Sequence, residues 1–168
     1  MTGEEAFQYD VAFSFLSQDE ALAVDLNERL KDRLTTFIYS DRERQETLAD
    51  SDGEEAFSLA FSKHARTVVV LYRAGWGERG FTGVEATAIR NRASEFGYDF
   101  TTFIPLDTPS TVPQWLPRSR IWVGLARWGV EHAATVIESR VQEAGGVPKE
   151  STAADVAARA IGRRLQIH

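Results

Sequence analysis

The sequence predicts an α/β protein built on a parallel β-sheet with helices on both faces. Strand-like and helix-like segments alternate along most of the chain, which is the pattern of consecutive β-α units. The strongest strand signal, residues 67–72, is an unbroken apolar run and indicates a strand buried on both faces. The length of 168 residues suits one main domain.

Each element has a local justification. Residues 9–15 form a short apolar run, and residues 35–39 are rich in β-branched and aromatic side chains. Between them, Leu22, Leu26 and Leu30 recur every four residues after a capping-box pattern that begins at Ser17, which predicts a helix. The five expected strands of the parallel sheet cover residues 9–15, 35–39, 67–72, 99–106 and 120–123, and the helices cover residues 17–33, 54–64, 82–96 and 130–144.

The expected domain covers residues 7–144. Residues 145–168 begin with a Gly-Gly-Val-Pro linker and continue into a further helix, 151–165, which we expect either to pack on the domain or to lead into another one.

Composition excludes several functional classes. The formal net charge is −6 and no dense basic run occurs, which disfavours nucleic acid and anionic membranes as partners. The chain has no cysteine, so disulfides, thiolate metal sites and a cysteine nucleophile are excluded, and a cytoplasmic location is expected. Its three histidines are too scattered for a metal site, and no membrane span or signal peptide is present in the sequence.

One carboxylate stands out from its helix. In the helix 82–96, Ala88, Ile89, Ala93 and Phe96 form the apolar side, and Glu85 lies on that same side, three and four residues before the first two. A carboxylate on a buried face needs a reason. The structural explanation is a capping box, in which Thr82 is the N-cap and Glu85 bonds back to it. The functional explanation is a catalytic group, and the two are compatible.

The topology predicts where a ligand would bind. In parallel sheets, ligands bind beyond the carboxyl ends of the strands. The segments 15–17, 40–53 and 73–81 all leave such ends, so they are expected to share one rim with Glu85 beside it. Residues 75–80 match G-x-G-x-x-G literally, but the first glycine comes three residues after the strand and Trp76 would crowd a pyrophosphate. We interpret this segment mainly as a flexible loop, with a Rossmann oxidoreductase as the minor alternative.

Five short segments follow one another along the chain. They are Tyr9-Asp-Val-Ala-Phe-Ser-Phe15 followed by Asp19, Phe37-Ile-Tyr-Ser-Asp41, Ala65-Arg-Thr-Val-Val-Val-Leu71, Phe81-x-x-x-Glu85 and Phe103-Ile-Pro-Leu106. Together they resemble the Toll/interleukin-1 receptor (TIR) domain family, above all its bacterial members. The resemblance covers about residues 7–144 in the family's element order. The chain departs from the family in that Phe81 replaces the usual tryptophan, and the loop 40–53 lacks the usual Gly-Pro start.

The resemblance implies an activity. In enzymatic TIR domains, the glutamate that matches Glu85 cleaves NAD⁺ between nicotinamide and ribose. It implies an effector of bacterial immunity with NAD⁺ as substrate, no cofactor and no metal, and other TIR domains as partners. Whether the product is ADP-ribose or a cyclic form stays open. The alternatives are a non-enzymatic module for homotypic assembly and another ribosyl-transfer enzyme. Besides Glu85, the residues expected to line the substrate site are Ser14, Phe15, Ser17, Asp41, Trp76 and Phe81.

Overall fold

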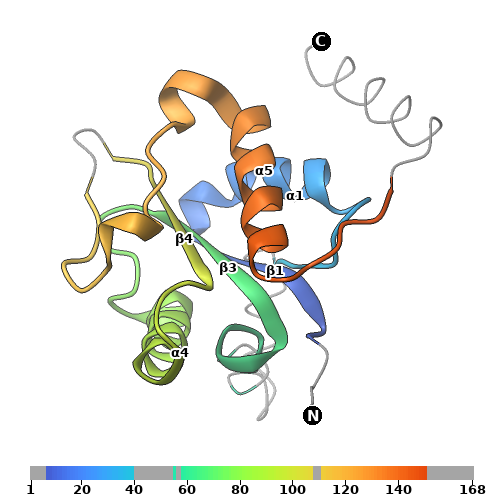
Figure 1. Ribbon diagram of the computed structural model, residues 1–168. Coiled ribbons are helices and arrows are strands. Elements are labelled where there is room, and N and C mark those ends of the chain that lie inside the picture. Colours follow the sequence, from blue (N-terminus) through green and yellow to red (C-terminus); the bar gives the residue numbers. More distant parts are fainter. Residues whose placement is uncertain (1–6, 40–54, 56–57, 108–110, 151–168) are drawn as a thin grey trace.

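The computed structural model describes residues 7–39, 55, 58–107 and 111–150 (Figure 1). Within these residues, four strands form one sheet in the order β2-β1-β3-β4, and every pair is parallel. The predicted α/β class and parallel sheet are confirmed, and the order matches the first four strands of a flavodoxin-like sheet. The strands are β1 (Tyr9–Ser14), β2 (Thr36–Phe37), β3 (Ala65–Tyr72) and β4 (Thr101–Pro105).

The helices lie close to where the sequence predicts them. α1 (Glu20–Leu30) follows a 3₁₀ turn, η1 (Ser17–Asp19), and the expected helix before β3 ends in a π-helical turn, η2 (Ala60–His64). α4 (Gly80–Phe96) and α5 (Leu125–Glu143) complete the set, and α5 is broken at Gly129, where φ is 83°. Among the described residues, no helix has the length and apolar character that a bilayer span requires.

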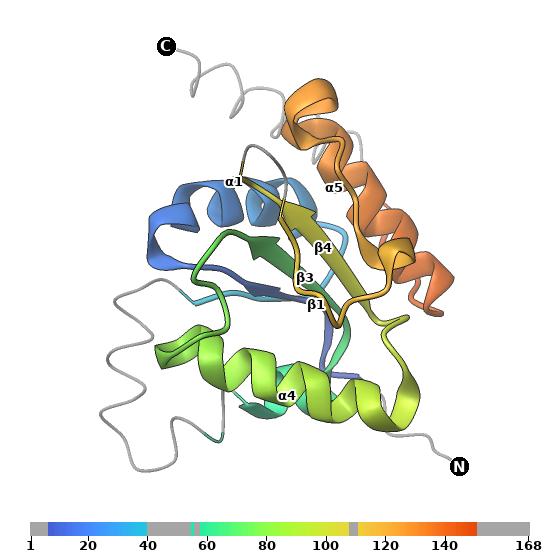
Figure 2. The ribbon, with the colours of Figure 1, turned by 90° about the vertical axis from the view of Figure 1, so that its left-hand side faces the viewer.

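Two helical layers cover the sheet, as expected (Figure 2). Because side chains alternate along a strand, Val68 and Val70 of β3 pack toward α4 and η2, whereas Val69 and Leu71 pack toward α1 and α5. All four side chains are buried, which confirms that β3 is covered on both faces. Burying each such side chain contributes about 1.5–3 kcal/mol, so the central strands dominate the stability of the fold.

The fifth expected strand, 120–123, is reduced to one bridge in the described part of the chain. Ile121 pairs with Phe103 of β4 in the parallel sense, and the Trp122 N–H donates to the Phe103 carbonyl over 2.9 Å. A 3₁₀ turn, η3 (Arg118–Arg120), includes the first residue of this segment. Gly124 follows it, held so tightly between two indole rings that a Cβ would lie 2.6 Å from the Trp122 ring. The extended stretch is therefore too short to form a strand ladder.

Two predictions fall outside the described residues. The loop 40–53, which contains Asp41, and the expected helix 151–165 are not among the residues that the structure describes.

Candidate functional site

Ser14, Trp76 and Glu85 meet in a buried hydrogen-bonded cluster. The Trp76 Nε1–H donates to Ser14 Oγ over 2.8 Å, and the Ser14 hydroxyl donates to Glu85 Oε1 over 2.6 Å. The carboxylate is 1% exposed and the indole 4% exposed, with Ser14 fully buried. A buried carboxylate is costly unless hydrogen bonds compensate it, and a short bond from a hydroxyl to a charged oxygen is among the stronger ones. The serine therefore fixes and stabilises the glutamate.

The cluster lies at the switch point of the sheet. Ser14 is the last residue of β1, and Trp76 belongs to the loop that leaves the carboxyl end of β3, the strand beside β1. Chain connections from β1 and β3 run to opposite faces of a sheet with this strand order, and in sheets of this kind ligands commonly bind at such a point. These three residues, which are far apart in sequence, thus lie together at this end of the sheet.

Strand and helix periodicity place Ser14 and Glu85. Val11 and Phe13 point toward α1 and α5, so Ser14, one residue further along β1, faces α4. On α4, Glu85 shares the buried face with Ala88, Ile89 and Ala93, as the sequence predicts, whereas Phe96, expected on the same side, is exposed. The glutamate is the sixth residue of the helix, beyond the first turn in which the helix dipole acts strongly. The hydrogen bond from the serine therefore matters more to this carboxylate than the helix end does.

The glycine-rich loop places Trp76. Gly75, Gly77 and Gly80 all have positive φ angles, of 99°, 83° and 64°, which side chains other than glycine's rarely allow. The Trp76 N–H donates to the Arg73 carbonyl over 2.9 Å, and the Gly77 N–H donates to Thr82 Oγ1 over 3.0 Å. These bonds make the segment a series of turns that folds the indole back over Ser14. The three glycines therefore shape a loop that carries a tryptophan. This agrees with the interpretation of residues 75–80 as a loop rather than as a dinucleotide-binding motif.

Two glycine substitutions test this geometry. Gly77→Ala should lower the free energy of unfolding by about 1–2 kcal/mol because φ is +83° and the new Cβ would lie 3.1 Å from the Ala86 Cβ. Gly83→Ala, inside α4 with its nearest neighbouring atom at 3.7 Å, should raise the same free energy by about 0.5–1 kcal/mol. Urea unfolding measures both. Equal effects of the two variants would contradict the loop conformation.

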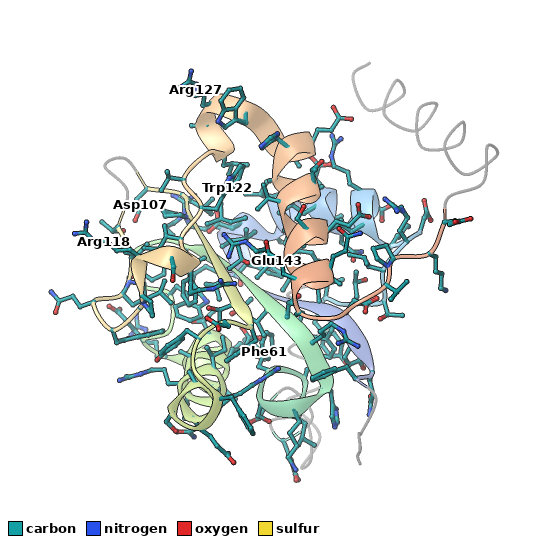
Figure 3. All side chains as sticks on the ribbon, viewed as in Figure 1. Phe61, Asp107, Arg118, Trp122, Arg127 and Glu143 are labelled. Atoms are coloured by element: carbon teal, nitrogen blue, oxygen red, sulfur yellow. The ribbon has the colours of Figure 1, made fainter. Side chains whose placement is uncertain are left out.

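Arg73 stabilises the start of the glycine-rich loop through ion pairs. Its guanidinium binds the Asp19 carboxylate with both a 2.8 Å and a 3.1 Å contact, and it reaches Asp107 at 3.4 Å. The Ala74 N–H also donates to Asp107 over 2.8 Å, and Asp107 lies just past the carboxyl end of β4 (Figure 3). The hydrogen bond to Asp19 raises the pKa of Arg73. One cation thus joins η1, the loop after β3 and the loop after β4.

The Tyr72 phenol, whose ring contacts Trp76, lies near two carboxylates. Burial raises the pKa of the Tyr72 phenol, and the negative charges of Glu78 and Asp107 raise it further. The phenol therefore stays protonated at neutral pH and can donate a hydrogen bond. The Arg73 guanidinium offsets the charge of Asp107, so Glu85 is the carboxylate in the cluster that could favour a transition state that gains positive charge.

The other predicted site residues lie elsewhere. Phe15 is fully buried in the core formed with α1 and α5, on the face of the sheet opposite Ser14 and Glu85, so it offers no exposed ring to a ligand in this conformation. Strand alternation explains this, because neighbouring residues point to opposite faces. Phe81, the second residue of α4, packs at the margin of the core on the α4 side. Ser17 opens η1 at the same end of the sheet, and Asp41 lies outside the described residues.

Both predicted capping boxes are wrong. α4 begins at Gly80 with Arg79 as its N-cap, so Thr82 lies inside the helix, where its hydroxyl binds the glycine loop instead. Similarly, α1 begins at Glu20 with Asp19 as its N-cap, and Ser17 belongs to the preceding 3₁₀ turn. In both cases the turn before the helix, which the four-residue pattern ignores, decides where the helix starts.

Sequence reasoning missed the role of Arg73 and Asp107. The sequence does contain a signal for this role: Arg73 comes directly after the buried strand β3, and Asp107 follows the end of β4. Among the described residues, no group of three or more histidine, aspartate and glutamate side chains could hold a metal ion.

No protein-family model matches this chain, and no curated protein matches its sequence. A functional conclusion therefore rests on the sequence motifs and on the geometry of the cluster. That geometry offers a buried carboxylate held by the Ser14 hydroxyl, which also bonds to the Trp76 indole.

Proposed function

We propose that this chain is a TIR domain that cleaves the nicotinamide–ribose bond of NAD⁺, with Glu85 as its catalytic carboxylate. The observation that carries the proposal is the 2.6 Å hydrogen bond from Ser14 to a glutamate that is 1% exposed, at the switch point of a parallel sheet. Strand order, the serine at the end of β1 and the position of Glu85 on α4 all agree with the resemblance in the sequence. The five-stranded TIR fold is part of the proposal, with Ile121 marking the place of the fifth strand.

The residues suit this chemistry. When the bond between the ribose C1′ and the nicotinamide nitrogen breaks, the electron pair leaves with nicotinamide, which departs neutral and needs no acid. The ribose becomes an oxocarbenium ion, which a fixed carboxylate stabilises. A water oxygen then attacks C1′ and loses a proton, which gives ADP-ribose; attack by an adenine nitrogen gives a cyclic product instead. Ser14 holds Glu85 in position.

Nicotinamide release from NAD⁺, measured with the wild-type chain immobilised at high density on beads, tests the proposed reaction. We expect nicotinamide to be released from NAD⁺ and no adenine to be released from adenosine. The reason is that the proposed site needs a cationic leaving group that departs as a neutral molecule. Base release from adenosine with no cleavage of NAD⁺ would favour another ribosyl-transfer enzyme. Dilute protein serves as the comparison, since TIR enzymes commonly act only when packed together.

One observation favours a second candidate, a non-enzymatic TIR module for homotypic assembly in the cytoplasm. Glu85 has almost no contact with solvent, and the Ser14 hydroxyl that holds it is itself bonded to the Trp76 indole. In this second candidate function, the cluster of Ser14, Trp76 and Glu85 stabilises the fold and takes no part in catalysis. The wild type would then self-associate, as sedimentation would show, and release no nicotinamide at any density.

A further inference from the structure

The site is closed in the conformation that the structure describes. Glu85 is 1% exposed, and the Trp76 indole, which donates a hydrogen bond to the serine that holds Glu85, is itself 4% exposed. A ligand cannot touch the carboxylate unless a side chain moves. Ser14 and Glu85 are held by a strand and a helix, whereas Trp76 is carried by a loop, so the indole is the group that can move away.

The indole fills a slot suited to a flat ring. Trp76 meets Tyr72 and Phe103 with centroid separations of 5.9 and 5.5 Å, both in edge-to-face contact. At the inner end of the slot, Ser14 Oγ accepts the hydrogen bond from the indole N–H. The slot thus provides aromatic walls and one acceptor, which together recognise a planar ring that carries an N–H group.

The loop has anchors at both ends and glycines between them. Arg73 is tied to Asp19 and Asp107 on one side, and Thr82 lies within α4 on the other. Between these anchors, Gly75 and Gly77 have positive φ angles. Glycines permit the large backbone changes that hinges need, so the segment 75–79 can swing while its anchors stay in place.

We propose that Trp76 is an intramolecular plug that occupies the subsite for a flat, N–H-bearing ring. This inference rests on the proposed function for the identity of that ring, which is nicotinamide with its carboxamide N–H directed to Ser14. When the segment 75–79 swings outward, the ring of the substrate takes the place of the indole, and the ribose comes to lie against Glu85.

Opening of the plug is measurable without any substrate. The chain has no cysteine, so Ser14→Cys introduces a single thiol under the indole, and Val68→Cys introduces one on the same face of the sheet, deeper in the core. In the folded protein, we expect N-ethylmaleimide to label the thiol of Ser14→Cys about tenfold or more faster than that of Val68→Cys.

The double variants identify the indole as the group that moves. Adding Trp76→Ala to Ser14→Cys should speed labelling of the thiol at position 14 further. Adding Trp76→Ala to Val68→Cys should leave the labelling rate of the thiol at position 68, divided by the rate of global unfolding, unchanged. Equal labelling of the two single variants, or no effect of Trp76→Ala on the thiol at position 14, would overturn the plug.

The ring specificity of the slot is tested with Ser14 intact. Saturation-transfer NMR on the Trp76→Ala variant should detect nicotinamide binding, and N,N-dimethylnicotinamide, which has no N–H, should bind more weakly. Equal binding of the two, or no binding of nicotinamide, would overturn the assignment of the slot.

Neither experiment uses cleavage of NAD⁺. If the labelling and binding results are as expected and NAD⁺ stays intact, the plug stands and the proposed reaction fails. If NAD⁺ is cleaved while labelling of Ser14→Cys does not respond to Trp76→Ala, the reaction stands and the plug fails.

Discussion

Glu85→Gln should lower the rate of nicotinamide release from NAD⁺ by about a thousandfold while leaving the fold intact. In the proposed reaction, the substitution removes the negative charge that would stabilise the oxocarbenium ion, and losses of about 10²–10³ are typical when one such electrostatic contact is removed. The glutamine keeps the size of the side chain and an oxygen that can accept the hydrogen bond from Ser14, so the melting temperature should change little.

The matched control is Glu95→Gln, which changes an exposed glutamate on the same helix. We expect wild-type rates from that variant when nicotinamide is quantified by chromatography with the protein at high density. A Glu85→Gln variant that cleaves NAD⁺ as fast as Glu95→Gln would show that Glu85 is not catalytic.

Arg73→Met should destabilise the protein by roughly 2–4 kcal/mol, the largest effect that we expect on stability. Asp19 is 6% exposed, and removing the guanidinium leaves its carboxylate buried without the cation that binds it twice. The estimate lies below the range for a fully buried pair because the arginine side chain is 31% exposed. At this chain length the melting temperature should fall by about 5–15 °C.

Arg79→Met, which replaces an exposed arginine of the same loop, is the control and should change the stability by less than about 0.5 kcal/mol. Adding Asp19→Leu to Arg73→Met should recover part of the loss because the unpaired buried charge disappears. Thermal unfolding followed by circular dichroism measures all of these variants. Melting of Arg73→Met within about a degree of wild type, against the expected fall, would mean that the pair does not hold the loop.

The arrangement of the central elements could be predicted because it follows from burial. An unbroken apolar run such as 67–72 fits only a strand covered on both faces, and β-α alternation then requires a parallel sheet. The edge of the sheet could not be predicted in this way. Residues 120–123 have the composition of a strand, but whether they pair depends on the turns and ring packing around them.

Part of the candidate site could also be predicted from burial patterns in the sequence. The apolar stripe of a helix revealed Glu85, and strand order brought Ser14 and Trp76 toward it. Alternation along β1 could also have shown that Phe15 faces away from Ser14. The Asp19–Arg73 pair joins residues 54 apart in sequence, and no local pattern marks such a contact.

A crystal structure of the Glu85→Gln variant grown with NAD⁺ tests most directly where the substrate binds. The prediction is that the nicotinamide ring lies beside Tyr72 and Phe103, with Trp76 displaced and the ribose C1′ against the substituted side chain at position 85. NAD⁺ bound elsewhere on the domain, with the indole still hydrogen-bonded to Ser14, would contradict it.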